Sequence, residues 1–318
     1  MPCYTPLTGW RSRHRNPTGK RSIVFTKSEG YEDLQIDVPC GQCKGCRLEH
    51  SRKWAVRCMH EAQMHENNCF ITLTYNNESL PEHETLVKRH FQLFMMRLRK
   101  RYGKGIRYYA CGEYGDKGGR PHYHACIFGM DFKDKKLWKN VNGGHPLYIS
   151  KELDKLWTDP KTGIQMGWTT IGEVNFETAA YVARYVMKKR KGKKSAEYYE
   201  KILPDGQIFQ REPEFPLMSR RPGIGKPWLD KWHKDTYPSD SVIVRGQEQK
   251  PPKYYDDIFE RDNPVTMAQI KYARRQAQRD AKDDNTLARL FVKGKCKTKQ
   301  TQQLKRSIEN ESTSILDI

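Results

Sequence analysis

The sequence has no long apolar run and no leading signal segment. None of its 318 residues lie in a stretch that approaches the ~20 consecutive apolar residues of a spanning helix, which speaks against an integral membrane protein. The start, MPCYTPLTGWRSRHR, lacks the basic patch and apolar core of a signal peptide. We therefore expect a protein that stays in a cytoplasm and has no membrane partner.

Acidic residues are few relative to basic ones. Lys and Arg total 58 against 38 Asp and Glu, which gives a formal net charge of +20. An excess of this size does not specify a fold, but it indicates a polyanionic partner. With a membrane disfavoured, nucleic acid is the expected partner. The basic residues gather at Arg97–Arg107, Lys188–Lys194 and Lys271–Arg279, where they either follow DNA phosphates or form solvated faces.

The nine cysteines form an odd set in a chain without an export signal, so a disulfide framework is not expected. Cys40, Cys43 and Cys46 form C-x-x-C-x-x-C, which can present three thiolates to Zn²⁺. A fourth thiolate would come from Cys3 or Cys58. Against zinc, no second C-x-x-C completes a ribbon, and the spacing also suits an iron–sulfur cluster. Free, partly buried thiols are the third interpretation.

The central part of the chain shows alternating helix and strand signals. Residues spaced as in a helix, or a composition typical of helices, predict helices at 48–65, 87–98, 151–157 and 177–189. Runs of β-branched and aromatic residues predict strands at 69–75, 106–112, 122–128 and 168–174. YGDKGGRP, between the second and third strands, is dense in turn formers and predicts a hairpin. This order predicts an α+β fold with a central antiparallel sheet and flanking helices.

Composition divides the chain into four parts. Residues 1–46 are rich in Gly, Pro and Cys and show little periodicity, so we expect an irregular segment that contains the candidate zinc site. Residues 47–200 hold the elements of the central domain. Residues 201–252 are punctuated by Pro and Gly and predict an extension and linker, with 234–252 as the best linker candidate. Residues 253–318 are expected to form a basic, helical C-terminal region.

A candidate metal site lies on the predicted hairpin. His122 and His124 are two apart in a strand and therefore project from one face. If the hairpin closes about residues 116–119, Glu113 lies directly opposite His122 and shares that face. Two imidazoles and one carboxylate would then converge and leave positions open, which suits a divalent cation that acts as a Lewis acid. The alternative is a strand with a polar, solvent-facing edge.

Two tyrosines form a candidate nucleophile pair. Tyr181 and Tyr185 are four apart in a predicted helix and share a face, and Lys188 and Lys189 follow one turn later. A phenol, with a pKa of about 10, is a poor nucleophile unless its target is activated or cations favour the phenolate. The lysines can also neutralise charge on a phosphate. The alternative interpretation is a pair of core aromatics.

Several motifs together resemble a known family. PHYHACIFG resembles the histidine–hydrophobic–histidine motif of the HUH endonucleases, and CFITLTY resembles the strand motif that precedes it. YVARYVMKK resembles the two-tyrosine motif in the form found in replication initiators of microviruses. The resemblance narrows to the gokushovirus branch of these phages through the ordered pieces PCGQCKGCRLEHSRKWAVRC, FITLTYNN, CGEYG, RPHYHACIFG, YVARYVMKK and RRPGIGKPW. It covers roughly residues 35–230.

The resemblance implies a ferredoxin-like HUH core in residues 47–200 and a rolling-circle replication initiator that acts in the cytoplasm of a bacterial host. It implies that His122 and His124 hold Mg²⁺ or Mn²⁺, with Glu113 as third ligand. One tyrosine would attack single-stranded origin DNA to give a 5′-phosphotyrosine and a free 3′-hydroxyl, which primes a host polymerase. The second would attack the regenerated origin, so that the displaced strand is released and closed. Because the sequence has no Walker A motif, unwinding is expected from a host helicase.

Three other classes explain part of these features. A non-haem iron oxygenase also uses two histidines and a carboxylate, but its ligands normally come from distant parts of the chain. A transposase or conjugative relaxase is disfavoured by the length and the microvirus-like motifs. A non-catalytic single-stranded DNA-binding or packaging protein explains the charge but not the convergent histidines and glutamate. The sequence therefore favours a nickase, with this binding protein as the alternative.

Overall fold

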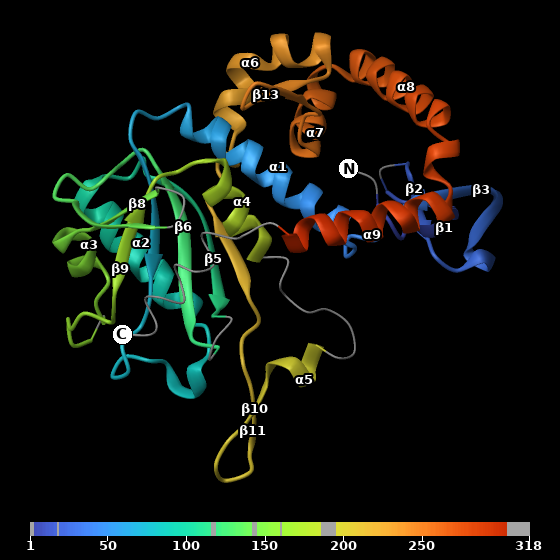
Figure 1. Ribbon diagram of the computed structural model, residues 1–318. Coiled ribbons are helices and arrows are strands. Elements are labelled where there is room, and N and C mark those ends of the chain that lie inside the picture. Colours follow the sequence, from blue (N-terminus) through green and yellow to red (C-terminus); the bar gives the residue numbers. More distant parts are fainter. Residues whose placement is uncertain are drawn as a thin grey trace. The chain divides into compact units, whose positions relative to one another are not determined.

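The computed structural model describes residues 3–17, 19–115, 119–141, 145–159, 161–185 and 195–303 (Figure 1). The chain divides into two compact units. The smaller comprises the described residues of 1–50 and 268–305, and the larger comprises the described residues of 51–267. Each unit is described by itself.

The larger unit is built on an antiparallel sheet that, within the described residues, has seven strands in the order β12-β5-β6-β4-β9-β8-β7. These strands are β4 (Asn68–Leu73), β5 (Arg107–Tyr114), β6 (Pro121–Phe128), β7 (Lys136–Val141), β8 (His145–Ile149), β9 (Thr169–Gly172) and β12 (Phe215–Met218). Every residue of β6 is buried, as expected of a central strand covered on both faces. The predicted α+β class with a central antiparallel sheet is confirmed.

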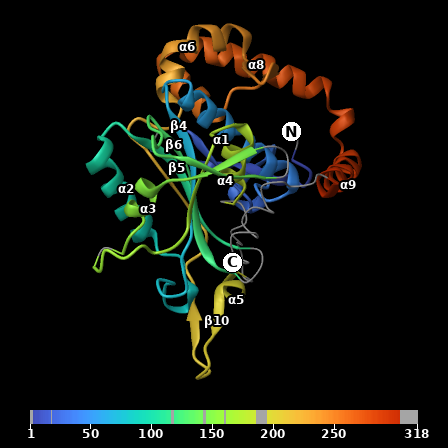
Figure 2. The same cartoon turned by 60° about the vertical axis from the view of Figure 1, so that its left-hand side comes forward.

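Helices cover both faces of this sheet (Figure 2). On one face, α2 (Lys88–Tyr102) and α3 (Lys151–Leu156) bury residues such as Phe91 and Leu153 against the sheet. On the other face lie α4 (Phe176–Tyr185) and α1 (Lys44–Ala62), of which the residues from 51 on belong to this unit. Their cluster of buried residues includes Ala55, Tyr181 and Val182. The site described below lies under α4, on this second face.

The predicted helices and strands of the central part are confirmed, except that residues 186–189 of the helix expected at 177–189 lie outside the described residues. Three strands of the sheet are not predicted by the sequence. β7 and β8 are short, and several of their side chains are exposed, including Leu137 and Ile149. The sequence pattern of β7 and β8 therefore does not distinguish these strands from a loop. β12 contains Pro216, which argues against a strand, yet β12 is the edge strand beside β5, where proline is tolerated.

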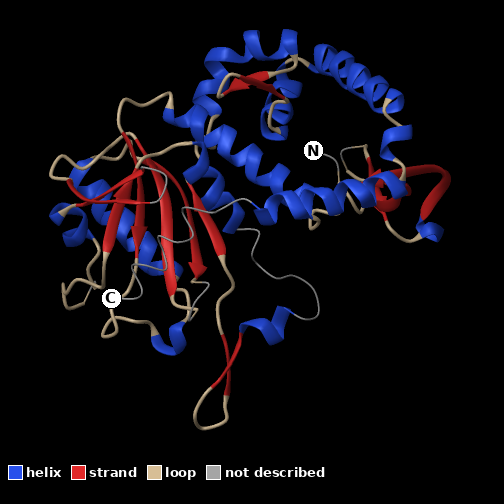
Figure 3. Ribbon diagram, viewed as in Figure 1, coloured by secondary structure: helices blue, strands red, loops and turns tan. Residues whose placement is uncertain are grey.

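The expectation of an irregular N-terminal segment is wrong. β1 (Leu7–Arg15), β2 (Arg21–Val24) and β3 (Gly30–Val38) form an antiparallel sheet in the order β2-β1-β3 (Figure 3). Most of their side chains are exposed on both faces, so the sequence lacks the apolar alternation by which a half-buried strand is recognised. The smaller unit also contains α9 (Leu287–Gln303) and most of α8 (Pro264–Asp280). These helices confirm the basic helical C-terminal region as far as residue 303; residues 304–318 lie outside the described residues.

Residues 234–252, the expected linker, are folded instead. They contain the end of α6 (Lys226–Ser239) and the hairpin of β13 (Val242–Val244) and β14 (Gln247–Gln249), and α7 (Lys253–Asp262) follows. The short helix α5 (Ser195–Tyr199) and the hairpin of β10 (Glu200–Ile202) and β11 (Ile208–Gln210) precede β12. Among the described residues, no helix combines the length and the apolar composition required to cross a bilayer.

A buried carboxylate joins three segments of the larger unit. Glu61 on α1 accepts hydrogen bonds from the Arg107 guanidinium on β5 and from the Gly225 N–H, 2.6 Å away, before α6. Gly225 has a φ of +79°, and a Cβ there would lie 2.4 Å from the Tyr255 hydroxyl, so only glycine fits. Burial alone would raise the pKa of Glu61, but hydrogen bonds from His65, Arg107 and Gly225 lower it by more. Gly225 of RRPGIGKPW thus serves the fold.

The substitution Glu61→Gln should lower the free energy of unfolding by about 3 kcal/mol near neutral pH, because it leaves the Arg107 guanidinium without its partner. Since the folded-state pKa of Glu61 is lowered, its stabilising effect is complete above the ordinary glutamate pKa of about 4.3 and is lost as the pH falls through the folded-state value. Urea unfolding at neutral and acidic pH measures both effects.

The difference between wild type and Glu61→Gln should therefore shrink in acid. Glu212→Gln is the matched control, because Glu212 pairs with Lys88 at the surface and should matter by less than about 1 kcal/mol. Equal losses from both substitutions at neutral pH would contradict the role given to Glu61.

Candidate active site

The hairpin of β5 and β6 has the register expected from the sequence. Glu113 is paired with His122, and Cys111 is paired with His124. On the other side of β6, His124 is paired with Thr72 of β4. Paired residues of neighbouring strands project from the same face, so these side chains gather on the side of the sheet that α4 covers.

Glu113, His122 and His124 converge with the spacing of metal ligands. Glu113 Oε1 lies 2.8 Å from His122 Nε2 and 3.2 Å from His124 Nε2. One ligand atom from each residue can be chosen so that all lie within 4.8 Å of one another. Neighbouring ligands on an octahedral cation with bonds of about 2.1 Å are about 3.0 Å apart, so a cation of the size of Mg²⁺ fits this donor set. The three side chains are 1%, 2% and 4% exposed, respectively.

Groups behind the imidazoles orient both rings. His122 Nδ1 lies 3.0 Å from the Arg120 carbonyl oxygen, which can only accept, so Nδ1 carries the proton and Nε2 faces Glu113. Thr72 Oγ1 lies 2.9 Å from His124 Nδ1 and can hold that ring in the same way. Such outer partners are typical of metal-binding histidines. His122 Nε2 and Glu113 Oε1 face one another at 2.8 Å, so a divalent cation could be bound by both atoms.

Glu113 is held in its charged form. Burial alone would raise its pKa, but the hydrogen bonds and positive charge of His122, and then of His124, outweigh burial and lower the pKa. Among the described residues, Glu113 Oε2 has no hydrogen-bond partner, which is costly for a buried carboxylate oxygen. A bound cation would satisfy that oxygen.

Tyr181 lies directly beside this cluster. Its ring centroid is 5.1 Å from that of His124, with the ring planes at 86°. The helix that carries it is held at two points: Asn175 and Thr178 cap its start, and the Ser51 hydroxyl donates to the Ala180 carbonyl oxygen. Tyr181 is 0% exposed, so a phosphodiester can reach its hydroxyl only after the groups that cover it have moved.

The structure places the other predicted nucleophile-site residues only in part. Tyr185 is the last residue of α4, one turn after Tyr181, and its backbone alone is described. Lys188 and Lys189 lie outside the described residues, as does the rest of the Lys188–Lys194 stretch.

Three basic residues of the stretch Arg97–Arg107 bond to other parts of the fold. Arg97 donates to the carbonyl oxygens of Leu156 and Thr158, and Arg99 donates to that of Ile106. Arg107 pairs with Glu61, as described above. These three guanidinium groups satisfy carbonyl oxygens and a carboxylate of the fold, whereas Lys100, Arg101 and Lys104 of the same stretch are exposed.

Four cysteines come together in the smaller unit. The thiols of Cys3, Cys40, Cys43 and Cys46 lie within 4.8 Å of one another. Cys3 is therefore the fourth member, which the C-x-x-C-x-x-C spacing leaves undecided. The alternative fourth ligand was wrong, because Cys58 is buried in the core of the larger unit with Cys111 and Cys126.

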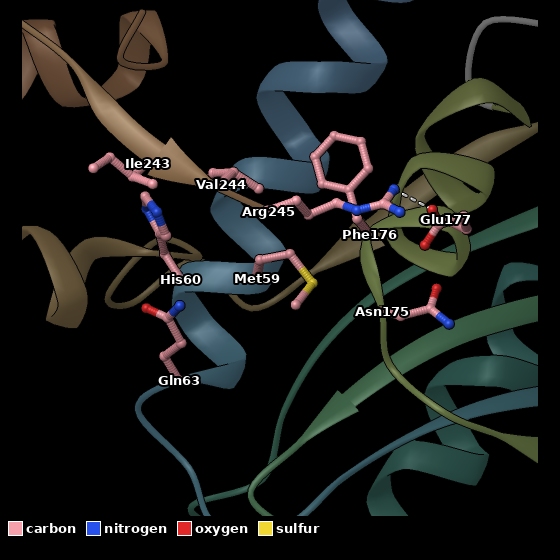
Figure 4. Close-up of a pocket in the computed structure, with 9 residues that line it drawn as sticks. All are labelled: Met59, His60, Gln63, Asn175, Phe176, Glu177, Ile243, Val244 and Arg245. Atoms are coloured by element: carbon pink, nitrogen blue, oxygen red, sulfur yellow. Dashed lines mark hydrogen bonds and ion pairs between the residues drawn. The ribbon is translucent and has the colours of Figure 1, made fainter. Parts of the chain in front are cut away.

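A cavity of about 230 Å³ lies elsewhere in the larger unit, between α1, the start of α4 and β13 (Figure 4). It is lined by Met59, His60, Gln63, Asn175, Phe176, Glu177, Ile243, Val244 and Arg245. The side chains of Arg245 and Glu177 point toward one another and form an ion pair. Burial lowers the pKa of His60 to about 3, so this imidazole is neutral. The lining includes none of the three converging residues and brings no comparable set of ligands together.

Comparisons with known proteins agree with the geometry. The family model for the replication-associated protein ORF2/G2P matches residues 68–190, which contain the hairpin and both tyrosines. The replication-associated protein VP4 of Bdellovibrio phage phiMH2K is 32% identical over 290 residues, which cover 85% of this chain and 84% of VP4. The replication-associated protein ORF2 of Spiroplasma virus 4 is 34% identical over 238 residues, 71% of this chain and 68% of that protein.

The replication-associated protein ORF4 of Chlamydia phage 1 is 34% identical over 172 residues, 51% of this chain and 41% of that protein. No solved structure matches. The resemblance to gokushovirus replication proteins is thereby confirmed. The chain belongs to the family of phage replication-associated proteins.

Proposed function

We propose that this protein initiates rolling-circle replication by nicking single-stranded origin DNA with a tyrosine, and that it later closes the displaced strand. The convergence of Glu113, His122 and His124 beside Tyr181 carries this proposal. Membership in a family of replication-associated proteins supports it.

Glu113, His122 and His124 would hold Mg²⁺ or Mn²⁺. The buried oxygen Glu113 Oε2 and the two imidazole nitrogens that face it fit such an ion. A cation bound there would polarise the scissile phosphodiester as a Lewis acid. Arg120 and Thr72 would keep the ligating nitrogens directed at the ion.

In the proposed reaction, a tyrosine oxygen attacks the phosphorus. The bond from phosphorus to the tyrosine oxygen forms as the bond to the 3′ oxygen breaks; the phenol loses its proton and the 3′ oxygen gains one. The 5′-phosphotyrosine keeps the phosphodiester bond energy, so attack by a 3′-hydroxyl rejoins the strand without a nucleotide cofactor. Tyr181 and Tyr185 would alternate as nucleophiles, and Lys188 and Lys189 would neutralise charge on the phosphate.

The remaining assignments follow from the same proposal. Residues 47–200 would be the catalytic domain, with β12 completing its sheet. The net charge of +20 would hold single-stranded DNA through its phosphates. A host helicase and a host polymerase would act with the protein in the bacterial cytoplasm.

One observation favours a second candidate function. Because Tyr181 is fully buried, it is available as a nucleophile only after a rearrangement. If that rearrangement does not occur and Tyr185 does not act in its place, the protein is a non-catalytic single-stranded DNA-binding or packaging protein, and Tyr181 is a core aromatic residue.

Covalent cleavage tests the proposal. With a single-stranded origin oligonucleotide labelled at its 3′ end and Mn²⁺, the labelled fragment should migrate with the protein on a denaturing gel. Chelation, the double variant Tyr181→Phe/Tyr185→Phe and His122→Ala should each lower this band at least about 100-fold, because each removes the nucleophiles or the metal site. Comparison of the two single variants identifies the first nucleophile.

Tyr198→Phe is the control, because Tyr198 is an exposed tyrosine outside this cluster and should leave the band unchanged. Wild-type protein that binds several candidate origins but never forms the band, with either Mg²⁺ or Mn²⁺, would leave the non-catalytic binding protein as the better account.

Thr72 provides a test of the metal centre that does not depend on cleavage. Thr72→Val removes the hydroxyl group beside His124 Nδ1 and should weaken Mn²⁺ binding about 10-fold, as is usual for an outer partner of a ligating histidine. Calorimetric titration with Mn²⁺ measures this change. Thr74→Val is the matched control, because Thr74 is buried just after the same strand but donates to the Trp168 carbonyl oxygen. Equal Mn²⁺ affinities of the two variants would contradict the role of Thr72.

A further inference from the structure

We propose that Cys3, Cys40, Cys43 and Cys46 bind one structural Zn²⁺ ion. The four cysteines come from three places in the smaller unit: the segment before β1, the turn after β3 and the first turn of α1. This inference is independent of the proposed nicking reaction.

The distances between the sulfur atoms match a tetrahedral zinc site. Cys3 Sγ lies 3.6 Å from Cys40 Sγ and 3.8 Å from Cys43 Sγ. With zinc–sulfur bonds of about 2.3 Å, the edges of a tetrahedron are about 3.8 Å long. A disulfide requires sulfur atoms about 2.05 Å apart, and all four cysteines are free. A four-iron cluster would stand between the thiolates and hold them farther apart, so the compact arrangement favours a single ion.

Backbone amides already point at the sulfur atoms. The Tyr4 N–H donates to Cys43 Sγ at 3.3 Å, and the Cys40 N–H donates to Cys3 Sγ at 3.3 Å. The Cys43 N–H donates to Cys40 Sγ at 3.2 Å. Gly41 makes this turn possible with a φ of +72°, a conformation that side chains disfavour. Such donors stabilise thiolates, the form of cysteine that binds metal.

The smaller unit needs such a link because its sheet buries almost no apolar side chain. Within β1, β2 and β3 the buried residues are Gly9, Ser12 and Gly30, and none of them carries a large apolar group. A small sheet without an apolar face is not expected to be stable by itself, and a structural metal is a common solution. A zinc ion at the four cysteines would tie the segment before β1 and the end of β3 to the start of α1.

The metal content of the full-length protein tests the inference. Protein purified without added metal or chelator should carry one zinc ion per chain by native mass spectrometry and elemental analysis. Mercurial titration of the thiols should release this zinc. Cobalt substitution should produce thiolate-to-cobalt charge-transfer bands together with the spectrum of a tetrahedral ion.

Two substitutions and two controls locate the ion. Cys3→Ser and Cys43→Ser should lose the zinc, whereas Cys296→Ser should keep it, because Cys296 is an exposed cysteine of the same unit outside the cluster. His122→Ala should also keep it, which separates this ion from a metal at the proposed active site.

Two results would overturn the inference. One is wild-type protein that contains iron or no stoichiometric metal; this result requires no variant, so misfolding of a variant cannot hide it. The other is a Cys3→Ser variant that retains full zinc content and the unaltered cobalt spectrum. Nicking by wild-type protein does not enter either result, so the two proposals can fail separately.

Discussion

The pairing of β5 with β6 is the constraint on which the rest of the site depends. Because Glu113 is opposite His122, and Cys111 is opposite His124, the carboxylate and both imidazoles share the face beneath α4. A slip of one residue in this register would turn Glu113 to the other face, where α2 and α3 pack. The side chains of β6 alternate between the two apolar layers of the larger unit, so packing on both faces enforces the register.

Burial determines what this arrangement can do chemically. The three converging side chains are almost inaccessible, and Tyr181 packs edge-on against His124. In such surroundings a charge that is left unpaired is costly, so a cation bound between the carboxylate and the two imidazoles, as proposed, would stabilise the site. The same burial shields Tyr181, one of the two proposed nucleophiles, from solvent. The proposed reaction therefore requires the covering groups to open when DNA binds.

The sequence predicted the convergence of Glu113, His122 and His124 better than it predicted the elements around them. The positions of Glu113, His122 and His124 follow from the two-residue repeat of a β-strand and from the turn of one hairpin. Both features depend only on residues that are close in the sequence. The place of Cys3 in the cysteine cluster depends on residues far apart in the sequence, because the pairing of Leu7 with Val38 brings Cys3 to Cys40. The strands that form this pair are exposed, so they have no apolar pattern from which the pairing could be predicted. β12 was missed because Pro216 is acceptable only on an edge strand, and edge position is a property of the assembled sheet. The burial of Tyr181 likewise depends on how α1 and α4 pack.

Peptide mapping of the protein after reaction with origin DNA and Mn²⁺ tests the central claim most directly. Trypsin cleaves after Arg184 and so places Tyr181 and Tyr185 in different peptides. After nuclease digestion of the attached strand, our account predicts that one of these two peptides carries the mass of a nucleotide attached through a 5′-phosphotyrosine. Chelation of the metal before the reaction should prevent this modification. A nucleotide on any other residue, or modification that persists without metal, would contradict the account.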